Sequence, residues 1–280
     1  MTIHIFLALI ILGAVQGITE FLPISSSGHL VILENIHYFK KSLHASGQDI
    51  NLLINVFLHL ATLLAVILFL KNDIYILIKG LFIGLKEKDY SKREIKIVIN
   101  ILAASIPAGL MGILLHSLLK KVFSSATIAF IFLIFNGIVL IATKKIPIKD
   151  RNIEEIGIGR SIFIGFCQAI AIMPGISRSG MTIAGGMFAG LKPLEAAKFS
   201  FLMAIPVITG AGFLEGVKVA QGSFPKNLLI PFIVSMIITV LVALISLKIL
   251  FHLVKKIKID IFGYYTIALG IIGLIIFHLF

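Results

Sequence analysis

The sequence predicts an all-α membrane protein that crosses the bilayer several times, and three observations lead to this fold class. The 280 residues are 59% hydrophobic and have a mean hydropathy of +1.09. Only 14% of them are charged, well below the ~25% that is usual in soluble domains. Several apolar runs approach or reach the ~20 residues that a helix needs to cross a bilayer. We therefore expect a polytopic membrane protein.

Six segments have the length and composition of full transmembrane helices. They are residues 52–70, 97–116, 126–143, 199–215, 228–250 and 261–279.

The basic residues between these segments indicate the orientation of the chain. Segments 71–96, 144–160, 191–198 and 251–260 together carry 17 Lys and Arg residues. The other three connecting segments (34–50, 117–125 and 216–227) together carry 6. The positive-inside rule then places the first set in the cytoplasm and both termini outside. Although the formal net charge is +12, the bases lie in short clusters that suit lipid headgroups, so we expect membrane lipids and no nucleic acid as partners.

Two further apolar regions are too short to span and are interrupted by polar residues. In the first, residues 5–15 precede and residues 29–33 follow the polar stretch QGITEFLPISSSGH. In the second, residues 161–173 precede and residues 181–190 follow PGISRSG. Half-helices of about 10–13 residues reach only the bilayer midplane, and non-helical backbone survives there only beside protein or water. The sequence therefore predicts two re-entrant helical hairpins.

The two hairpins belong to two halves of opposite orientation. By the charge count, the first enters from outside and the second from inside, and each precedes three spans, as in inverted-repeat membrane proteins. Residues 13–31 also align with 165–183 at a constant offset of 152, with seven identities in nineteen positions. We predict a first repeat in residues 1–150 and an inverted second repeat in residues 151–280, joined in one membrane domain.

The differences between the aligned copies predict an asymmetric polar site. Ser26 aligns with Arg178, and Glu20 aligns with an isoleucine. If the hairpin tips meet, the second copy supplies a guanidinium, the hydroxyls of nearby residues and a helix N-terminus. These groups favour an anion, most readily phosphate. The hydroxyls on this side belong to Ser177, Ser179 and Thr182.

The first copy supplies the groups for chemistry. Gln16 and Glu20 are four residues apart and share a helical face, where oxygen ligands suit Mg²⁺ or Ca²⁺. Ser26 is a candidate nucleophile, and His29 is a candidate proton carrier. The residues leave open whether serine, histidine or water attacks phosphorus. Ser25 and Ser27 are either substrate-binding hydroxyls or helix caps.

These stretches resemble the two signature regions of the undecaprenyl-diphosphatase family (BacA/UppP). QGITEFLPISSSGH fits its (E/Q)xxxE pattern and PGISRSGMT fits its PGxSRSxxT pattern, within a chain of similar length and hydropathy. The resemblance implies hydrolysis of undecaprenyl diphosphate to the monophosphate, recycling of the peptidoglycan lipid carrier and bacitracin resistance. It also implies a divalent cation and a site that opens to the periplasmic side of the bacterial inner membrane.

The residue patterns and this resemblance together give the polar residues of the two motifs their expected roles. The catalytic residues are Glu20, Ser26, His29 and Arg178; the substrate-binding residues are Gln16, Ser25, Ser27, Ser177, Ser179 and Thr182; and Glu20 is the expected metal ligand. Because Gln16 stands where family members can carry Glu, a metal bridged by two carboxylates from this pair is in doubt.

A flippase or transporter of the lipid phosphate or of another anion, in place of hydrolysis or as a second activity, is the rival interpretation, because opposed repeats with broken helices are a transporter architecture. The sequence leaves the oligomeric state open, a homodimer included.

Overall fold

The computed structural model describes residues 2–35, 39, 51–114, 125–147, 150–221 and 228–279. Apart from one isolated bridge between Arg151 and Leu191, the described residues contain helices and turns only. The all-α prediction is therefore confirmed for this part of the chain. The α-helices are α1 (Thr2–Thr19), α2 (Ser26–Asn35), α4 (Asn51–Phe69), α5 (Lys71–Glu87), α6 (Arg93–Leu114), α8 (Ala126–Ala142), α9 (Gly157–Ile170), α10 (Arg178–Phe188), α11 (Pro193–Gln221), α12 (Leu229–Lys255) and α13 (Asp260–Leu279), with 3₁₀ turns η1 (Thr143–Lys145) and η2 (Ile153–Glu155).

The helix lengths make the chain a multi-pass membrane protein. Within the described ranges, α6, α8, α11, α12 and α13 are long and apolar enough to cross a membrane. The helices α4 and α5 pass the same test as a pair and are bent by 75° at their junction. Each of the six expected spans therefore coincides with a helix, although residues 115–116 of the second span lie outside the described residues.

The segment 71–96 corrects a prediction. The sequence assigns it to a connecting loop, but Lys71–Glu87 forms α5, which begins two residues after α4 ends and packs against α6. The helix ends at Lys88, whose backbone is left-handed, with φ of 57°. Lysines spaced along α5 lower its hydropathy below that of a span, which is why its apolar residues are not read as a membrane helix.

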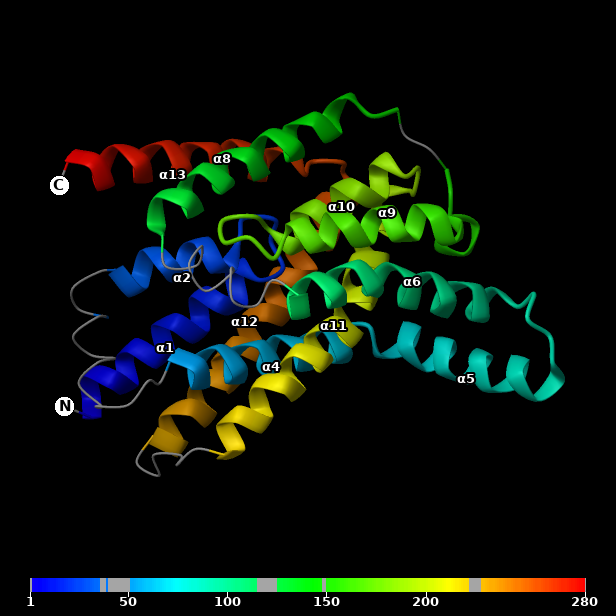
Figure 1. Cartoon of the computed structure of the whole chain (residues 1–280), viewed down its shortest axis with the longest axis horizontal. Helices are drawn as coiled ribbons and strands as arrows, with labels where there is room; N and C mark the ends of the chain where they lie inside the picture. The colour runs from blue at the N-terminus through cyan, green and yellow to red at the C-terminus, as the bar shows by residue number, and fades with distance from the viewer. Residues whose placement is uncertain are drawn as a thin grey trace.

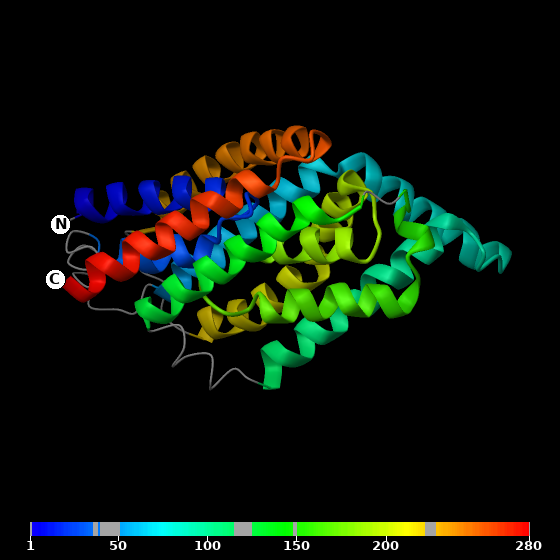
Figure 2. The ribbon, with the colours of Figure 1, turned by 90° about the horizontal axis from the view of Figure 1, so that it is seen from above.

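The two hairpins come from opposite ends of the molecule. Figure 1 shows α1 and α2 with their outer ends near both chain termini, whereas α9 and α10 enter from the other end, and the tips meet in the middle. The long helices run roughly lengthwise beside them (Figure 2). The first half-helix is longer than expected: α1 has 18 residues rather than the eleven of residues 5–15, because it begins three residues earlier, at Thr2, and continues through Gln16 to Thr19.

Close packing of small residues positions the hairpins. A Cβ built on Gly13 of α1 would lie 2.8 Å from the Ser235 carbonyl oxygen of α12. A Cβ on Gly165 of α9 would clash with the Ala104 carbonyl oxygen of α6. Each hairpin thus has one helix held directly against the backbone of a long helix. The largest buried apolar cluster, which includes Phe21, lies beside the tips.

Candidate active site

The chain turns sharply at the tip of the first hairpin. After α1 ends, residues 20–24 form turns, and Ser25 takes a left-handed backbone with φ of 69°. The Ser25 Oγ accepts a hydrogen bond from Gly28 N at 3.2 Å and so caps α2. Strained backbone of this kind, costing roughly 1–3 kcal/mol, is concentrated at functional sites.

The tip of the second hairpin has a related geometry. Ser177 caps α10, and its Oγ accepts from Gly180 N at 3.1 Å. The sequence expectation that GISRSG opens a helix is confirmed, since α10 begins at Arg178. In each tip the capping hydroxyl also contacts the hydroxyl two residues later, at 3.2 Å for Ser25 and Ser27 and at 3.0 Å in the second copy.

Glu20 is the centre of the polar cluster, and its side chain receives three hydrogen bonds. Ser26 Oγ donates to Oε2 at 2.7 Å, and Gln16 Nε2 donates to the same oxygen at 3.0 Å. Arg178 Nη2 donates to Oε1 at 2.8 Å. The structure therefore brings together four of the predicted site residues, which come from both hairpins.

Arg178 and Glu20 form an ion pair that is largely removed from solvent. Their side chains are 17% and 7% exposed. Arg178 Nη1 is buried and has no hydrogen-bond partner among the described residues. A second guanidinium nitrogen thus remains available as a donor beside the carboxylate, and an unpaired buried donor is costly unless a ligand or water meets it.

Asn136 of α8 ties the two tips together. Its Nδ2 donates to the Pro23 carbonyl at 3.1 Å, and its Oδ1 accepts from Ser177 N at 3.0 Å. Two weaker bonds also cross between the tips: Gly175 N donates to Ser27 Oγ at 3.4 Å, and Ser179 Oγ donates to the Leu22 carbonyl at 3.4 Å. The expected meeting of the two tips is therefore present.

His29 makes its side-chain hydrogen bonds outside the Glu20 cluster. Its Nδ1 is 2.8 Å from the Ser25 carbonyl oxygen, and its Nε2 is 2.7 Å from the Tyr265 hydroxyl of α13. Within the described residues, it makes no hydrogen bond with Ser26 or Glu20. In this arrangement the Glu20 carboxylate, rather than the His29 imidazole, contacts the Ser26 hydroxyl.

The hydroxyls of the second tip are engaged in holding that tip. Thr182 is fully buried, and its Oγ1 donates to the Arg178 carbonyl at 2.7 Å and contacts Ser200 Oγ at 2.5 Å. Ser177 and Ser179 are also buried, at 2% and 1% exposure. As arranged here, these hydroxyls fix the backbone around Arg178.

The oxygen atoms of Glu20 and its neighbours are too few to coordinate a hard cation alone, so such an ion would also need oxygen ligands from the substrate. The described residues contain no group of three or more His, Cys, Asp or Glu side chains placed to hold a metal ion. Gln16 Oε1 is nevertheless buried and has no partner in the described chain. One carboxylate, one amide oxygen and phosphate oxygens match the sparse protein ligation typical of Mg²⁺.

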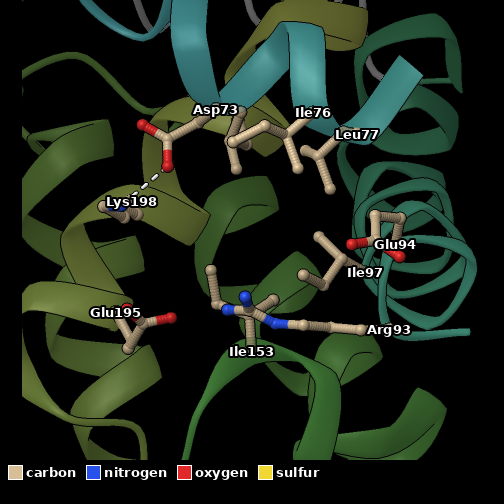
Figure 3. Close-up of a pocket in the computed structure, with 10 residues that line it drawn as sticks. Asp73, Ile76, Leu77, Arg93, Glu94, Ile97, Ile153, Glu195 and Lys198 are labelled. Carbon is tan, nitrogen blue, oxygen red and sulfur yellow. Dashed lines mark hydrogen bonds and ion pairs between the residues drawn. The ribbon is translucent and has the colours of Figure 1, made fainter. Parts of the chain in front are cut away.

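A separate cavity of about 80 Å³ lies between α5, α6, α11 and η2. Lys198 Nζ lies 2.7 Å from Asp73 Oδ1 at its edge, and Figure 3 shows this ion pair as a dashed line. Its lining contains none of the residues of the two polar motifs. We therefore place the candidate active site at the hairpin tips and not in this cavity.

Sequence reasoning missed two residues of the site, Asn136 and Tyr265. Asn136 is a lone amide in an otherwise apolar span, a pattern that also fits an ordinary interhelical hydrogen bond. Tyr265 lies near the start of a span, where tyrosines are common at the membrane interface, so nothing in the sequence marks it.

The fold and site define a helical membrane protein with a buried arginine–carboxylate–serine cluster suited to a phosphate ester or anhydride. The chain belongs to the family described as "Bacitracin resistance protein BacA", whose model matches residues 9–272.

Curated relatives match nearly the full chain. A protein named undecaprenyl-diphosphatase from Thermosipho africanus is 39% identical over 94% of this chain and 97% of its own. Proteins of the same name from Methanosphaera stadtmanae and Rubrobacter xylanophilus are each 36% identical. The match to the Methanosphaera protein covers 96% of this chain and 97% of that relative. The match to the Rubrobacter protein covers 93% of this chain and 94% of that relative.

Proposed function

We propose that this chain hydrolyses undecaprenyl diphosphate to undecaprenyl phosphate and inorganic phosphate, and so recycles the lipid carrier of peptidoglycan synthesis and confers bacitracin resistance. The observation that carries the proposal is the continuous contact from Arg178 through Glu20 to Ser26 across the two hairpin tips. The names of the relatives and their near-complete coverage support the same activity.

The chemistry follows from the charges of these groups. The Arg178 guanidinium binds phosphate oxygens and stabilises negative charge that develops during displacement. Ser26 Oγ attacks the terminal phosphorus while Glu20 Oε2 takes its proton, and the bond from phosphorus to the bridging oxygen breaks. Undecaprenyl phosphate leaves, and water then hydrolyses the phosphoserine to release inorganic phosphate. Direct attack by water with Glu20 as base is the alternative, and it needs no covalent intermediate.

His29 and the remaining hydroxyls have supporting roles in this proposal. His29 carries protons between the tip and its surroundings, while attack by His29 itself is not supported by its bonds to Ser25 and Tyr265. Ser27, Ser177, Ser179 and Thr182 shape the anion pocket through the bonds that hold each tip. Ser25 caps α2, which directs the free N–H groups of that helix toward the substrate.

A divalent cation, Mg²⁺ or Ca²⁺, fits as a component of the complex with substrate. Glu20 and the free Gln16 Oε1 would hold it, together with diphosphate oxygens. Such an ion offsets negative charge on the phosphates.

We also propose that the two halves are inverted repeats. In the two repeats, α1 corresponds to α9, and α6 corresponds to α12. The helix α1 of the first repeat packs against α12 of the second, and in the equivalent contact α9 of the second repeat packs against α6 of the first. The Gly13 and Gly165 contacts described above are equivalent under the same relationship. The helices α8 and α13 are also equivalent in the two repeats, and their contact is reciprocal. A Cβ on Gly137 would lie 2.5 Å from the Gly263 carbonyl oxygen, and a Cβ on Gly263 would lie 2.6 Å from the Gly137 carbonyl oxygen.

The lipid tail explains the depth of the site. The substrate's polyprenyl chain stays in the bilayer, so the phosphates must meet a polar site at membrane depth. We propose that the site opens to the periplasmic face of the bacterial inner membrane, with both termini on that side. Cysteines introduced at Ile3 and Tyr90 into a Cys167→Ser background test this orientation. An impermeant maleimide should label the cysteine at position 3 on intact spheroplasts and that at position 90 only after lysis; the reverse pattern would refute the orientation.

Phosphate release from undecaprenyl diphosphate by the purified protein in detergent tests the activity. We expect release that stops when EDTA is added and resumes with excess Mg²⁺ or Ca²⁺. An absence of release in all metal conditions, from a protein that remains folded, would refute the proposed function. The transporter alternative is not favoured by the relatives, and a homodimer stays a prediction.

A further inference from the structure

One face of α5 carries an exposed stripe in which lysines alternate with aromatic rings. Its members are Lys71, Tyr75, Lys79, Phe82 and Lys86, which are spaced by three or four residues and so lie along one side of the helix. All five are exposed, Tyr75 by 65% and Phe82 by 69%. Ion pairs of these three lysines are absent among the described residues. The opposite side, with Leu77 and Gly84, is buried against the rest of the protein.

The direction of α5 makes a second transmembrane passage unsuitable. It departs from α4 by 75°, so the two helices cannot both lie along the membrane normal. Figures 1 and 2 show α5 projecting beyond the end of the bundle that is opposite to the chain termini. Aromatic rings prefer the depth of the headgroups, and lysines extend from that depth toward phosphate.

We propose that this stripe is a binding surface for anionic phospholipid headgroups at one membrane face. The alternation supplies what such a surface requires: each ring enters the headgroup layer between two ammonium groups that pair with lipid phosphates. Each Lys near an anionic leaflet contributes about 1 kcal/mol of attraction, and salt screens this attraction. The inference does not depend on the catalytic proposal.

Because the chain contains no tryptophan, a single Phe82→Trp variant is a clean probe. The variant is placed in phosphatidylcholine vesicles with or without phosphatidylglycerol, using lipids brominated at shallow or deep acyl positions. We expect stronger quenching by the shallow bromines. Ile245→Trp, at an exposed position within α12, is the depth control and should be quenched more by the deep bromines.

The lysines are tested in the Phe82→Trp background by Lys71→Gln, Lys79→Gln and Lys86→Gln together. We expect phosphatidylglycerol to shift the emission of the introduced tryptophan to the blue and this shift to be lost in the triple variant and in high salt. Changing Lys255, Lys256 and Lys258 to Gln removes the same charge from another exposed segment and should leave the shift unchanged. Three results would overturn the proposal: quenching of the Phe82→Trp variant by aqueous iodide but not by brominated lipid, deep quenching like that of the Ile245→Trp control, or an equal response of both triple variants.

A different observation identifies a residue that acts on His29. The carbonyl of Ser25 can only accept, so His29 Nδ1 carries the hydrogen of that 2.8 Å bond. In the neutral ring Nε2 is then an acceptor, and the Tyr265 hydroxyl at 2.7 Å donates to it. The two rings are nearly parallel, with an interplanar angle of 5° and centroids 5.8 Å apart.

We infer that Tyr265 is a positioning residue for His29, an inference that rests on the proposed role of His29 in phosphate release. Its hydroxyl holds the ring orientation, while the acceptor-only Ser25 carbonyl selects the Nδ1–H tautomer. When Nε2 gains a proton, the same phenolic oxygen can accept the new N–H, so the contact persists in both charge states. Tyr265 is 46% exposed and links the hairpin tip to the outside of the helix bundle.

The test compares Tyr265→Phe with Tyr264→Phe, the same change at the neighbouring position. Second-shell partners of histidine ligands in metal enzymes are typically worth about 10–100-fold in activity, and we take this as the scale for a positioning partner of His29. We expect Tyr265→Phe to lower kcat by about that factor with KM nearly unchanged, and Tyr264→Phe to match the wild type. In a His29→Asn background, Tyr265→Phe should have no further effect.

The hydrogen bond at Nε2 provides a readout that does not depend on turnover. In ¹⁵N-histidine spectra, assigned by comparison with His29→Asn, both proteins should show the Nδ1–H form, and Tyr265→Phe should shift the Nε2 resonance because that nitrogen loses its donor. An unchanged spectrum, or an equal loss of kcat in the wild-type and His29→Asn backgrounds, would overturn the inference. If the wild type released no phosphate, the proposed function would fail while the spectra still decided whether Tyr265 orients the ring.

Discussion

The guanidinium of Arg178 donates to Glu20 at 2.8 Å, although the two residues are 158 positions apart in the chain. Burying such a pair is costly, because the loss of hydration offsets most of the attraction between the charges. Its retention at the meeting point of two hairpins therefore points to function rather than to stability. A phosphate entering the site would either share the Arg178 guanidinium with Glu20 or displace the Glu20 carboxylate from it.

Arg178→Lys keeps the positive charge but removes the planar fork that binds two oxygens at once. We expect phosphate release to fall at least about 100-fold, the scale of losing one charge-stabilising donor. Arg93→Lys is the matched control, since Arg93 also pairs with a glutamate, Glu154 at 2.9 Å, but far from the tips. Equal activity of the two variants in a phosphate-release assay would contradict the role of Arg178.

The positions of the two hairpins could be predicted because their polar breaks repeat at a fixed offset. Internal similarity and the distribution of basic residues together placed Glu20 and Arg178 at one site. The sequence could not show which hydroxyls are free, since that depends on the turn geometry of Ser25 and on neighbours such as Ser200. It also missed α5, because interspersed lysines hide its apolar residues, and Tyr265, whose partner is distant in the chain.

Ser26 is the hydroxyl in contact with the Glu20 carboxylate, so Ser26→Ala should abolish most turnover. General-base activation is typically worth about 100–10,000-fold, and a loss of that size is expected in phosphate release. Ser246→Ala removes a hydroxyl that donates to the Val242 carbonyl of its own helix, α12, and should leave activity unchanged. Rapid acid quench with substrate labelled at the terminal phosphate should trap phosphoserine at Ser26. Absence of label, together with the absence of a burst of undecaprenyl phosphate, would instead favour attack by water.

Asn136→Leu removes both bonds that connect the tips through α8. The Pro23 carbonyl and Ser177 N would remain buried without a partner, at about 1–3 kcal/mol each. We expect a lower unfolding temperature in detergent and a loss of phosphate release. Asn100→Leu removes one comparable buried bond, to the Ile153 carbonyl, and should lower stability less without changing kcat. Normal activity in Asn136→Leu would show that the bridge does not position the site.

Gly137 and Gly263 allow α8 and α13 to touch through their backbones, next to Asn136 and two residues before Tyr265. Gly137→Ala would place a methyl group 2.5 Å from the Gly263 carbonyl oxygen, so the helices must separate. Overpacking of this kind typically costs about 1–3 kcal/mol, and the shift should also move Asn136 and lower phosphate release. Gly109→Ala on α6 meets no atom within 4 Å and should be neutral or stabilise the helix by roughly 0.5–1 kcal/mol. Thermal unfolding and turnover of the two variants decide the matter, because indistinguishable behaviour would mean that the α8–α13 contact does not hold the tips in place.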